Sequence, residues 1–284
     1  MSKIEWTRND DGTEGKTWNP IGGCSIVSPG CTNCYAMRMA ARIEKMQPDS
    51  HYAGLTRQVN GNPVWTGQIA RAPDKTFYAP LKWKKPTRVF VNSMSDLFHK
   101  DVPDEWIDEI FRIMAETPQH TYQILTKRPV RMRGYVQRFY NSRAPVWEGQ
   151  GVPKGRLDIL RNLWLGVSVE DQSRADERIP RLLETPAAVR FISAEPLLGP
   201  LDLRQFLVEQ HIINDFVLAP LSLCIVGGES GPGKRPVNID WMRDIMDQCK
   251  AAGVPLFVKQ IDKKIPIPDD LMIREWPKAK EFEI

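Results

Sequence analysis

From residue 87 onward the chain repeats one pattern: a short β-branched or aliphatic run ends in polar or glycine residues and is followed by a helix-like stretch. Near-continuous apolar strands that alternate with helices predict a parallel sheet covered on both faces. Right-handed crossovers leave an open doubly wound sheet or a barrel, and the lack of a GxGxxG or Walker A motif disfavours the open nucleotide-binding sheets. The expected strands lie at 17–21, 88–93, 121–126, 163–169, 189–193, 221–226 and 255–259.

A chain of 284 residues can hold one barrel of about 250 residues. We therefore expect a single α/β domain over residues 1–284, a partial (β/α) barrel of six or seven parallel strands. Residues 46–86 contain five prolines and little periodicity, which predicts an irregular insertion or lid over one end of the sheet. Residues 261–284 are expected to wrap the surface. Helices are expected at 35–45, 103–116, 239–252 and after Pro129.

Five cysteines are present, and three of them, Cys24, Cys31 and Cys34, lie within eleven residues of a glycine-rich loop. Clustered thiols in a chain this long predict a metal site rather than a disulfide scaffold. Three soft thiolates suit either zinc or the iron of a cluster. Zinc needs a fourth ligand, and no fourth cysteine is near in sequence, whereas a [4Fe–4S] cluster held by three thiolates leaves one iron open. A chance grouping of core thiols is the third alternative.

A three-cysteine loop after the first strand of a parallel barrel resembles the radical S-adenosylmethionine superfamily. More closely, "WNP.GC" and "GC.NCYA", with "VNSMSDLFH", "LTKRP", "GVSVED", "ISAEPLLG" and "VGGESG", resemble uncharacterised phage and bacterial three-Cys-motif proteins over most of the chain. The superfamily resemblance implies that S-adenosylmethionine chelates the open iron and is cleaved reductively to a 5′-deoxyadenosyl radical. The chain departs from the usual pattern, because six residues rather than three separate the first two cysteines and Tyr35 follows the third.

Polar and glycine residues stand at the carboxyl ends of the expected strands, where parallel barrels place their chemistry. The resemblance implies that groups after the second strand bind the methionine ammonium group and that groups on the fourth and fifth strands bind the ribose. Two glycines would let the backbone approach the cofactor. Each polar residue can instead cap a helix or face water. The candidate cofactor-binding residues are Asn92, Ser93, Ser95, Asp96, Ser168, Glu170, Glu195, Gly227 and Gly228.

Three further residues are candidate catalytic groups. Lys127, like Lys259, stands where it can hold an anionic group, and Glu229 follows the two glycines. Cys224 lies inside an apolar strand, so it is either a core thiol or a hydrogen-atom donor to a product radical. Cys249 shares a helical face with apolar residues and is expected in the core.

A basic stretch between Pro118 and Trp147 carries six cations and no acidic residue, with aromatic residues interleaved. Cations for phosphates and aromatic rings for bases are what nucleic-acid binding uses. The alternative is a solvated helix face whose aromatic residues turn to the core. With a second basic run, the candidate nucleic-acid-binding residues are Lys82, Lys84, Lys85, Arg128, Arg131, Arg133 and Arg138.

These observations predict a [4Fe–4S] enzyme of the radical S-adenosylmethionine type that acts on nucleic acid or a nucleotide, with DNA repair or modification as an analogy. Such an enzyme needs an electron donor. The alternatives are a zinc-stabilised nucleic-acid-binding protein and a non-catalytic iron–sulfur redox sensor. The net charge of +4 neither requires nor excludes nucleic acid. No apolar run is long enough to span a bilayer and no signal peptide is visible, so we expect a cytoplasmic protein without a membrane partner.

Overall fold

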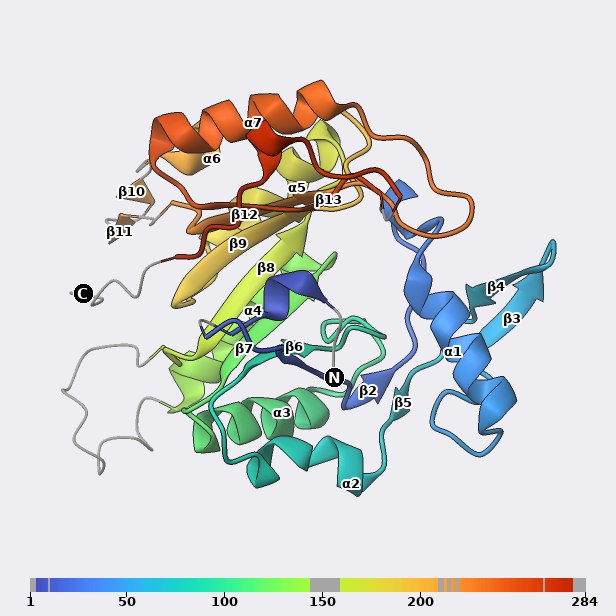
Figure 1. Cartoon of the computed structure of the whole chain (residues 1–284). Helices are drawn as coiled ribbons and strands as arrows, with labels where there is room; N and C mark the ends of the chain where they lie inside the picture. The colour runs from blue at the N-terminus through green and yellow to red at the C-terminus, as the bar shows by residue number, and fades with distance from the viewer. Residues whose placement is uncertain are drawn as a thin grey trace.

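Seven parallel strands pair in chain order in the computed structural model, which describes residues 4–9, 11–143, 159–208, 212–213, 216–217, 220–262 and 264–277. The sheet curls into a half barrel with β1 and β13 at its two edges, as Figure 1 shows. The predicted α/β partial barrel is therefore confirmed. The strands are β1 (Lys16–Trp18), β6 (Arg88–Val91), β7 (Thr121–Thr126), β8 (Leu163–Ser168), β9 (Val189–Ala194), β12 (Leu223–Gly227) and β13 (Leu256–Gln260).

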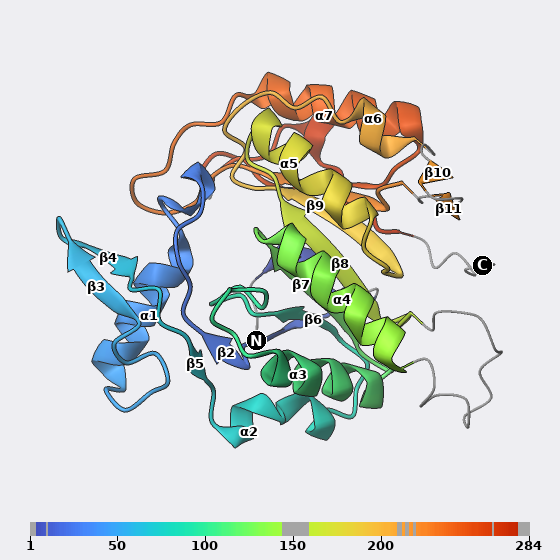
Figure 2. The ribbon, with the colours of Figure 1, turned by 180° about the vertical axis from the view of Figure 1, so that it is seen from behind.

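Helices cover the convex face of the sheet (Figure 2). The helix α3 (Asp104–Glu116) begins directly after Pro103, and Asp104 and Glu105 lie in its positively polarised first turn. The helix α7 (Ile239–Ala252) is capped by the Asn238 side chain and ends at Gly253, whose φ is +67°. The other helices are α4 (Pro129–Arg143), α5 (Gln172–Leu183) and the short α6 (Arg204–Leu207).

The two faces of the sheet bury different residues. Tyr122 and Ile124 of β7 face the large core under the helices, whereas Phe90 and Trp164 face the concave interior. Strand alternation explains the division, because successive side chains point to opposite faces. The interior is filled by Trp6 from the N-terminal turn η1 (Glu5–Thr7), whose ring lies 4.6 Å from that of Phe90.

The segment expected as an irregular lid contains regular elements, so that part of the prediction is wrong. The strands β3 (Thr56–Val59) and β4 (Asn62–Trp65) form a hairpin whose turn, Asn60-Gly61, has positive φ at both residues, as a type I′ turn requires. This Asn-Gly pair is a hairpin signal that the proline content obscured. The hairpin packs on α1 (Tyr35–Met46) beside the strand ends. Next come β5 (Ala70–Arg71), which pairs with β2 (Ile21–Gly22), then α2 (Asp74–Phe77) and η3 (Ala79–Lys82).

The C-terminal segment runs along the free edge of β13. Arg274 forms an antiparallel bridge with Phe257, and the Glu275 backbone N–H donates to the Leu256 carbonyl at 2.9 Å. Residues 278–284 of the expected wrap lie outside the described residues. The other short elements are η2 (Pro29–Cys31), η4 (Asp269–Leu271), β10 (Ile212–Ile213) and β11 (Phe216–Val217). None of the described helices combines the length and the apolar character that crossing a bilayer requires.

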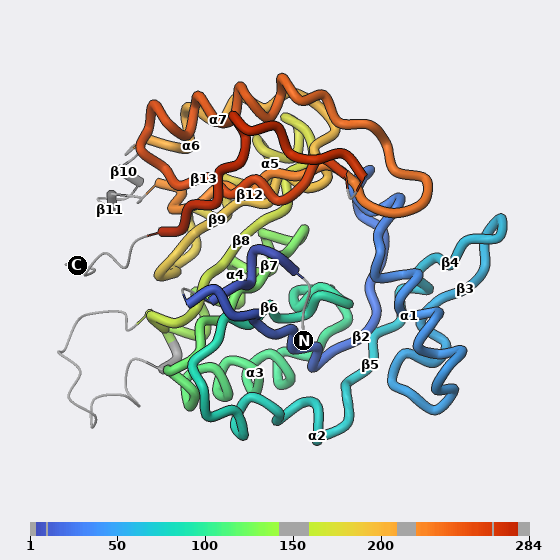
Figure 3. Tube along the Cα trace, in the orientation of Figure 1, coloured from blue at the N-terminus to red at the C-terminus, as the bar shows by residue number. Residues whose placement is uncertain are grey.

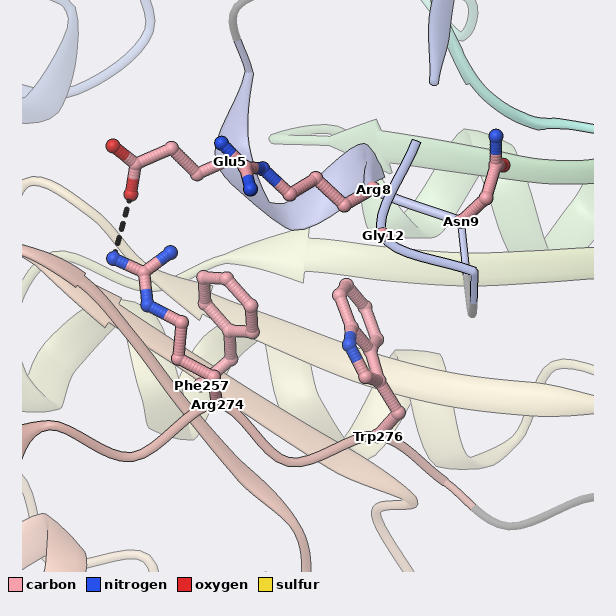
Figure 4. A pocket seen from close by; sticks show the side chains of 7 residues that line it. All are labelled: Glu5, Arg8, Asn9, Gly12, Phe257, Arg274 and Trp276. Atoms are coloured by element: carbon pink, nitrogen blue, oxygen red, sulfur yellow. Dashed lines mark ion pairs between the residues drawn. The ribbon is translucent and has the colours of Figure 1, made fainter. Parts of the chain in front are cut away.

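A hollow of about 470 Å³ lies between the N-terminal and C-terminal segments on the concave side (Figure 4). Glu5 and Arg274 pair across it at 2.9 Å, and Phe257 and Trp276 form its apolar wall. Phe257 is the second residue of β13, so the hollow lies toward the amino ends of the strands. It is therefore distinct from the carboxyl-end mouth that the cysteine loop crosses.

Candidate functional site

The three-cysteine loop crosses the carboxyl-end mouth of the half barrel (Figure 3). It leaves β2 through Gly23, whose φ is +91° and whose position would bring a Cβ atom within 2.1 Å of the Gln68 carbonyl oxygen. Only glycine suits such a site. Gly23 bridges to Ser95 after β6, and the chain then passes through η2 to α1. The loop therefore starts beside β1 and reaches the far side of the sheet.

A set of hydrogen bonds fastens the loop to the segment after β12. The Glu229 carboxylate accepts from the Asn33 side-chain amide at 2.9 Å and from the Arg235 backbone N–H at 2.7 Å. The Arg235 guanidinium also donates to the Pro29 carbonyl at 3.0 Å. We call Asn33, Glu229 and Arg235 the clasp. It joins residues about 200 apart in sequence and fixes the loop across the mouth.

The three thiols are half-buried and form no disulfide. Burial, helped by the Asp96 carboxylate, raises the pKa of Cys24 to about 12, and the Arg128 guanidinium opposes this shift. Burial also raises the pKa of Cys34, against the backbone N–H of Ala36 and the charge of Lys127. Cys31 interacts electrostatically with both other thiols. Metal binding at this loop must therefore release protons.

A zinc site and an iron–sulfur cluster require different distances between the cysteine sulfurs. Among the residues that the structure describes, no three Cys, His, Asp or Glu side chains are grouped closely enough to hold an ion. A tetrahedral zinc with Zn–S bonds of about 2.3 Å needs its sulfurs about 3.8 Å apart. In a [4Fe–4S] cluster each thiolate binds a different iron, so less convergence is required. The donor set is three half-buried free thiols on one loop, and such soft ligands suit either zinc or the irons of a cluster.

The residues after β6 have two different environments. Ser95 donates to the Ile21 carbonyl at 2.9 Å and Ser93 donates to the Asn19 side chain at 3.0 Å, so both hold the chain that leads into the cysteine loop. Asp96 pairs with Arg128 at 2.8 Å. Asn92 is only 3% exposed, and neither polar atom of its carboxamide has a partner among the described residues. The other three side chains each form a hydrogen bond, so Asn92 is the candidate left without one among the described residues.

The later strands deliver polar groups to the interior at their carboxyl ends. Because successive side chains alternate between the two faces, Ser168, Ser193 and Lys259 lie on the concave face. That face is apolar nearer the amino ends of the same strands. Lys259 pairs with Glu195 at 2.5 Å, and both side chains are 19% exposed. Gly227 lies beside this pair, because a Cβ there would be 3.6 Å from the Glu195 carboxyl carbon. Ser193 was not among the predicted site residues, although it occupies the same level as Ser168.

Several predicted site residues instead hold the protein together. Glu170, 0% exposed, pairs with buried Arg178 at 3.0 Å, so its carboxylate is already used. Gly228 is needed because a Cβ there would lie 2.0 Å from the Ile261 carbonyl oxygen, which is a contact within the chain and not with a cofactor. Glu229 belongs to the clasp, so we correct its predicted catalytic role to a positioning one. The pairing of Glu170 with Arg178 and of Glu229 with distant Asn33 left no signal in the sequence.

Cys224 faces the helix-covered core and not the mouth. It is fully buried, and contact with the Cys249 thiol raises its pKa further. This placement fits the core-thiol interpretation and gives a hydrogen-atom donor no access to a substrate. Lys127, by contrast, directly follows β7 at its carboxyl end, where its backbone N–H donates to Asp96 at 3.1 Å and its charge acts on both Cys34 and Glu170.

The basic stretch on α4 does not form a free cationic surface. Arg131 and Arg138 both pair with Asp104 at 2.8 Å, and Arg133 pairs with Glu184. The interleaved Tyr135, Phe139 and Tyr140 are buried in the core, and Trp147 lies outside the described residues. These ion pairs with Asp104 and Glu184 favour the alternative of a solvated helix face, and the α4 part of the nucleic-acid expectation stays a prediction. Arg138 is exposed as well as paired, and the exposed candidates without a described ion pair are Lys82, Lys84 and Lys85, which precede β6 at the amino-end side of the sheet.

Gln123 is a polar residue in the interior that the sequence interpretation missed. It is 0% exposed on β7, in register with Phe90 and Trp164, and neither carboxamide atom has a partner among the described residues. The only sign of this residue in the sequence is a polar side chain between the apolar residues Tyr122 and Ile124 of β7.

A protein-family model matches residues 1–278, nearly the whole chain. No curated protein and no solved structure matches the chain. The extent of the family match covers the half barrel, the cysteine loop and the clasp alike. The chain therefore belongs to the family described as protein of unknown function DUF5131.

Proposed function

We propose that the protein is a [4Fe–4S] enzyme of the radical S-adenosylmethionine type, with the cluster held by Cys24, Cys31 and Cys34. One observation carries the proposal: a loop with three half-buried free thiols crosses the mouth of a parallel half barrel whose interior turns polar at the same end. Parallel barrels place their chemistry at this end. Three thiolates without a fourth protein ligand suit a [4Fe–4S] cluster, because such a cluster leaves one iron open.

When bound, the cluster and S-adenosylmethionine would supply reductive cleavage of a carbon–sulfur bond and a hydrogen-abstracting radical. The chain's own residues would bind and orient the cofactor. Asn92 offers an unused carboxamide for its amino or carboxylate group, and Lys127 offers a cation for the carboxylate. Ser168 and Ser193 offer hydroxyls for the ribose, beside the Glu195–Lys259 pair. The apolar interior beneath, closed by Trp6, would keep water away from a reactive intermediate.

Anaerobic purification followed by iron and sulfide analysis tests the cluster. We expect a brown protein with about four iron and four sulfide per chain and absorption near 400 nm. Replacing each of Cys24, Cys31 and Cys34 by Ala should abolish this signal. Cys249→Ala is the matched control, because this thiol is buried in the core, and it should keep the cluster. A colourless wild-type protein with stoichiometric zinc would overturn the proposal and favour the zinc alternative.

Radical chemistry requires a second measurement. The reduced protein should release 5′-deoxyadenosine from S-adenosylmethionine, and Asn92→Ala should weaken S-adenosylmethionine binding. A protein that carries the cluster but neither binds S-adenosylmethionine nor releases 5′-deoxyadenosine would instead be a redox sensor.

A nucleotide or nucleic-acid substrate is a separate proposal. Among the basic candidates, the exposed cations for which no ion pair is described are Lys82, Lys84 and Lys85, at the end of the sheet opposite the cysteine loop. If these lysines bind a nucleic-acid backbone, affinity should fall steeply with salt and fall further in a triple Lys→Ala variant. Binding that is insensitive to both changes would exclude that surface.

A further inference from the structure

Arg128 makes the closest charged contact with a cysteine of the loop. Its guanidinium lies 3.8 Å from the Cys24 sulfur, with a geometry that lets the N–H donate to it. The same side chain donates to Ser25, the next residue, at 2.8 Å to the hydroxyl and 3.3 Å to the carbonyl. Its side chain is only 13% exposed. Arg128 therefore both places the chain at Cys24 and brings a fixed positive charge to the sulfur.

Asp96 balances this cation, because it pairs with the same guanidinium nitrogen that faces the Cys24 sulfur. It accepts from Arg128 at 2.8 Å, from the Thr126 hydroxyl at 2.7 Å and from the backbone N–H groups of Lys127 and Phe98 at 3.1 and 3.0 Å. Its side chain is 7% exposed. Four donors fix the carboxylate, so a cation and an anion are both held in place beside Cys24.

The two charges act in opposite directions on any negative charge at this sulfur. The Arg128 cation, 3.8 Å from the sulfur, favours negative charge there, and the Asp96 carboxylate paired with it disfavours negative charge. Reduction adds an electron to a thiolate-bound cluster, and hydrogen bonds to sulfur together with nearby charge set its potential. The little solvent that reaches Arg128 and Asp96 screens these effects weakly.

We propose that the Asp96–Arg128 pair sets the reduction potential of the Cys24-ligated cluster, with Arg128 raising the potential and Asp96 lowering it. The inference rests on the proposed function, because it requires a cluster. It assigns to Arg128 a positioning and tuning role in place of the nucleic-acid contact expected from the basic stretch. The proposal also replaces the predicted cofactor contact of Asp96, because both Asp96 carboxylate oxygens accept hydrogen bonds within the protein.

Anaerobic redox titration of the cluster, followed by absorption or electron paramagnetic resonance, tests the assignment. At a fixed applied potential, Arg128→Gln should lower the ratio of reduced to oxidised cluster about tenfold, which is about 59 mV for one electron. Asp96→Asn should raise that ratio. Arg131→Gln is the matched control, because this α4 cation pairs with Asp104 and no contact with Cys24 is recorded for it among the described residues. It should leave the ratio unchanged.

The outcomes distinguish the two proposals. A wild-type protein without a cluster overturns both, whereas a cluster whose potential is the same in wild type, Arg128→Gln and Asp96→Asn overturns this one alone. If Arg128→Gln loads no cluster, Arg128→Lys keeps the cation without the guanidinium fork. Arg128→Lys should then lower the ratio of reduced to oxidised cluster, by less than Arg128→Gln would, whereas Asp96→Asn should raise it. Equal or same-signed shifts would refute the tuning role.

Discussion

Removing the Glu170 carboxylate should destabilise the protein strongly. Glu170 and Arg178 are 0% and 2% exposed, and their charged groups lie 3.0 Å apart. Glu170 also accepts from the Gly30 backbone N–H at 3.4 Å, and Arg178 donates to the Ser168 carbonyl at 2.8 Å. Glu170→Ala would leave the guanidinium of Arg178 buried without a counter-charge. It would also release one of the attachments of the cysteine loop.

The size of the effect follows from burial. Breaking a buried ion pair by removing one partner costs about 3–5 kcal/mol, against a total stability of about 5–15 kcal/mol for a typical protein. The double variant Glu170→Met with Arg178→Met should regain most of that loss, because apolar residues of similar volume replace a buried pair at little cost. The cost therefore belongs to the orphaned charge and not to the lost volume.

Urea unfolding followed by circular dichroism measures the change, with Glu177→Ala as the control on the exposed face of the same helix. A loss below about 0.5 kcal/mol in Glu170→Ala, the size of an ordinary surface substitution, would refute the argument. Hydrogen bonds and the Arg178 charge, against the opposing effect of burial, hold the pKa of Glu170 below its usual value of 4.5. Its stabilisation is thus complete above that value and is lost as pH falls through the lower folded-state pKa. The difference in unfolding free energy between wild type and Glu170→Gln should therefore shrink as pH falls through that pKa.

Three further predictions follow from single residues. Gln123→Met should raise the unfolding free energy by about 1–3 kcal/mol in urea melts, because it removes an unpaired buried carboxamide, and a loss of stability would show that the amide is bonded. Gly23→Ala should lower the unfolding free energy more than Gly12→Ala does in the same assay. Both glycines have positive φ, but only at Gly23 would the new Cβ lie 2.1 Å from a backbone oxygen, so equal losses would contradict this contact. Lys234→Met should return the pKa of Asp262, about 2 beside the lysine, toward 3.8 in an NMR titration, and an unchanged value would assign the shift to the backbone donors. The stabilisation by the Lys234–Asp262 pair should persist above about pH 4 and disappear as pH falls toward 2.

Local pattern was enough to predict the scaffold. The run Thr121–Thr126 is a strand with the predicted bounds, because β-branched and aliphatic residues buried on both faces have few other uses. The Pro103-Asp104-Glu105 sequence marked the start of α3 for a similarly local reason. Where two local signals conflicted, as at Asn60-Gly61 among many prolines, the hairpin was missed.

The use of polar groups could not be predicted in the same way. A carboxylate at a strand end is equally suited to a ligand or to a partner within the chain, and the choice depends on residues far away in sequence. Glu229 finds Asn33 nearly 200 residues earlier, and Arg128 finds Cys24 about 100 residues earlier. The cations of α4 seemed unopposed in sequence only because Asp104 and Glu184 lie on other helices. The sequence alone shows which chemical groups are present but not which of them pair in the folded protein.

The clasp has a consequence for the order in which a newly made chain acquires its final form. Asn33 can reach its partners only after residues 229–235 have left the ribosome, when most of the chain has already been synthesised. Until then the loop with the three cysteines lacks its attachment on the β12 side. Until that segment has been synthesised, the clasp cannot hold the loop across the mouth, so the three thiols reach their final positions late in synthesis.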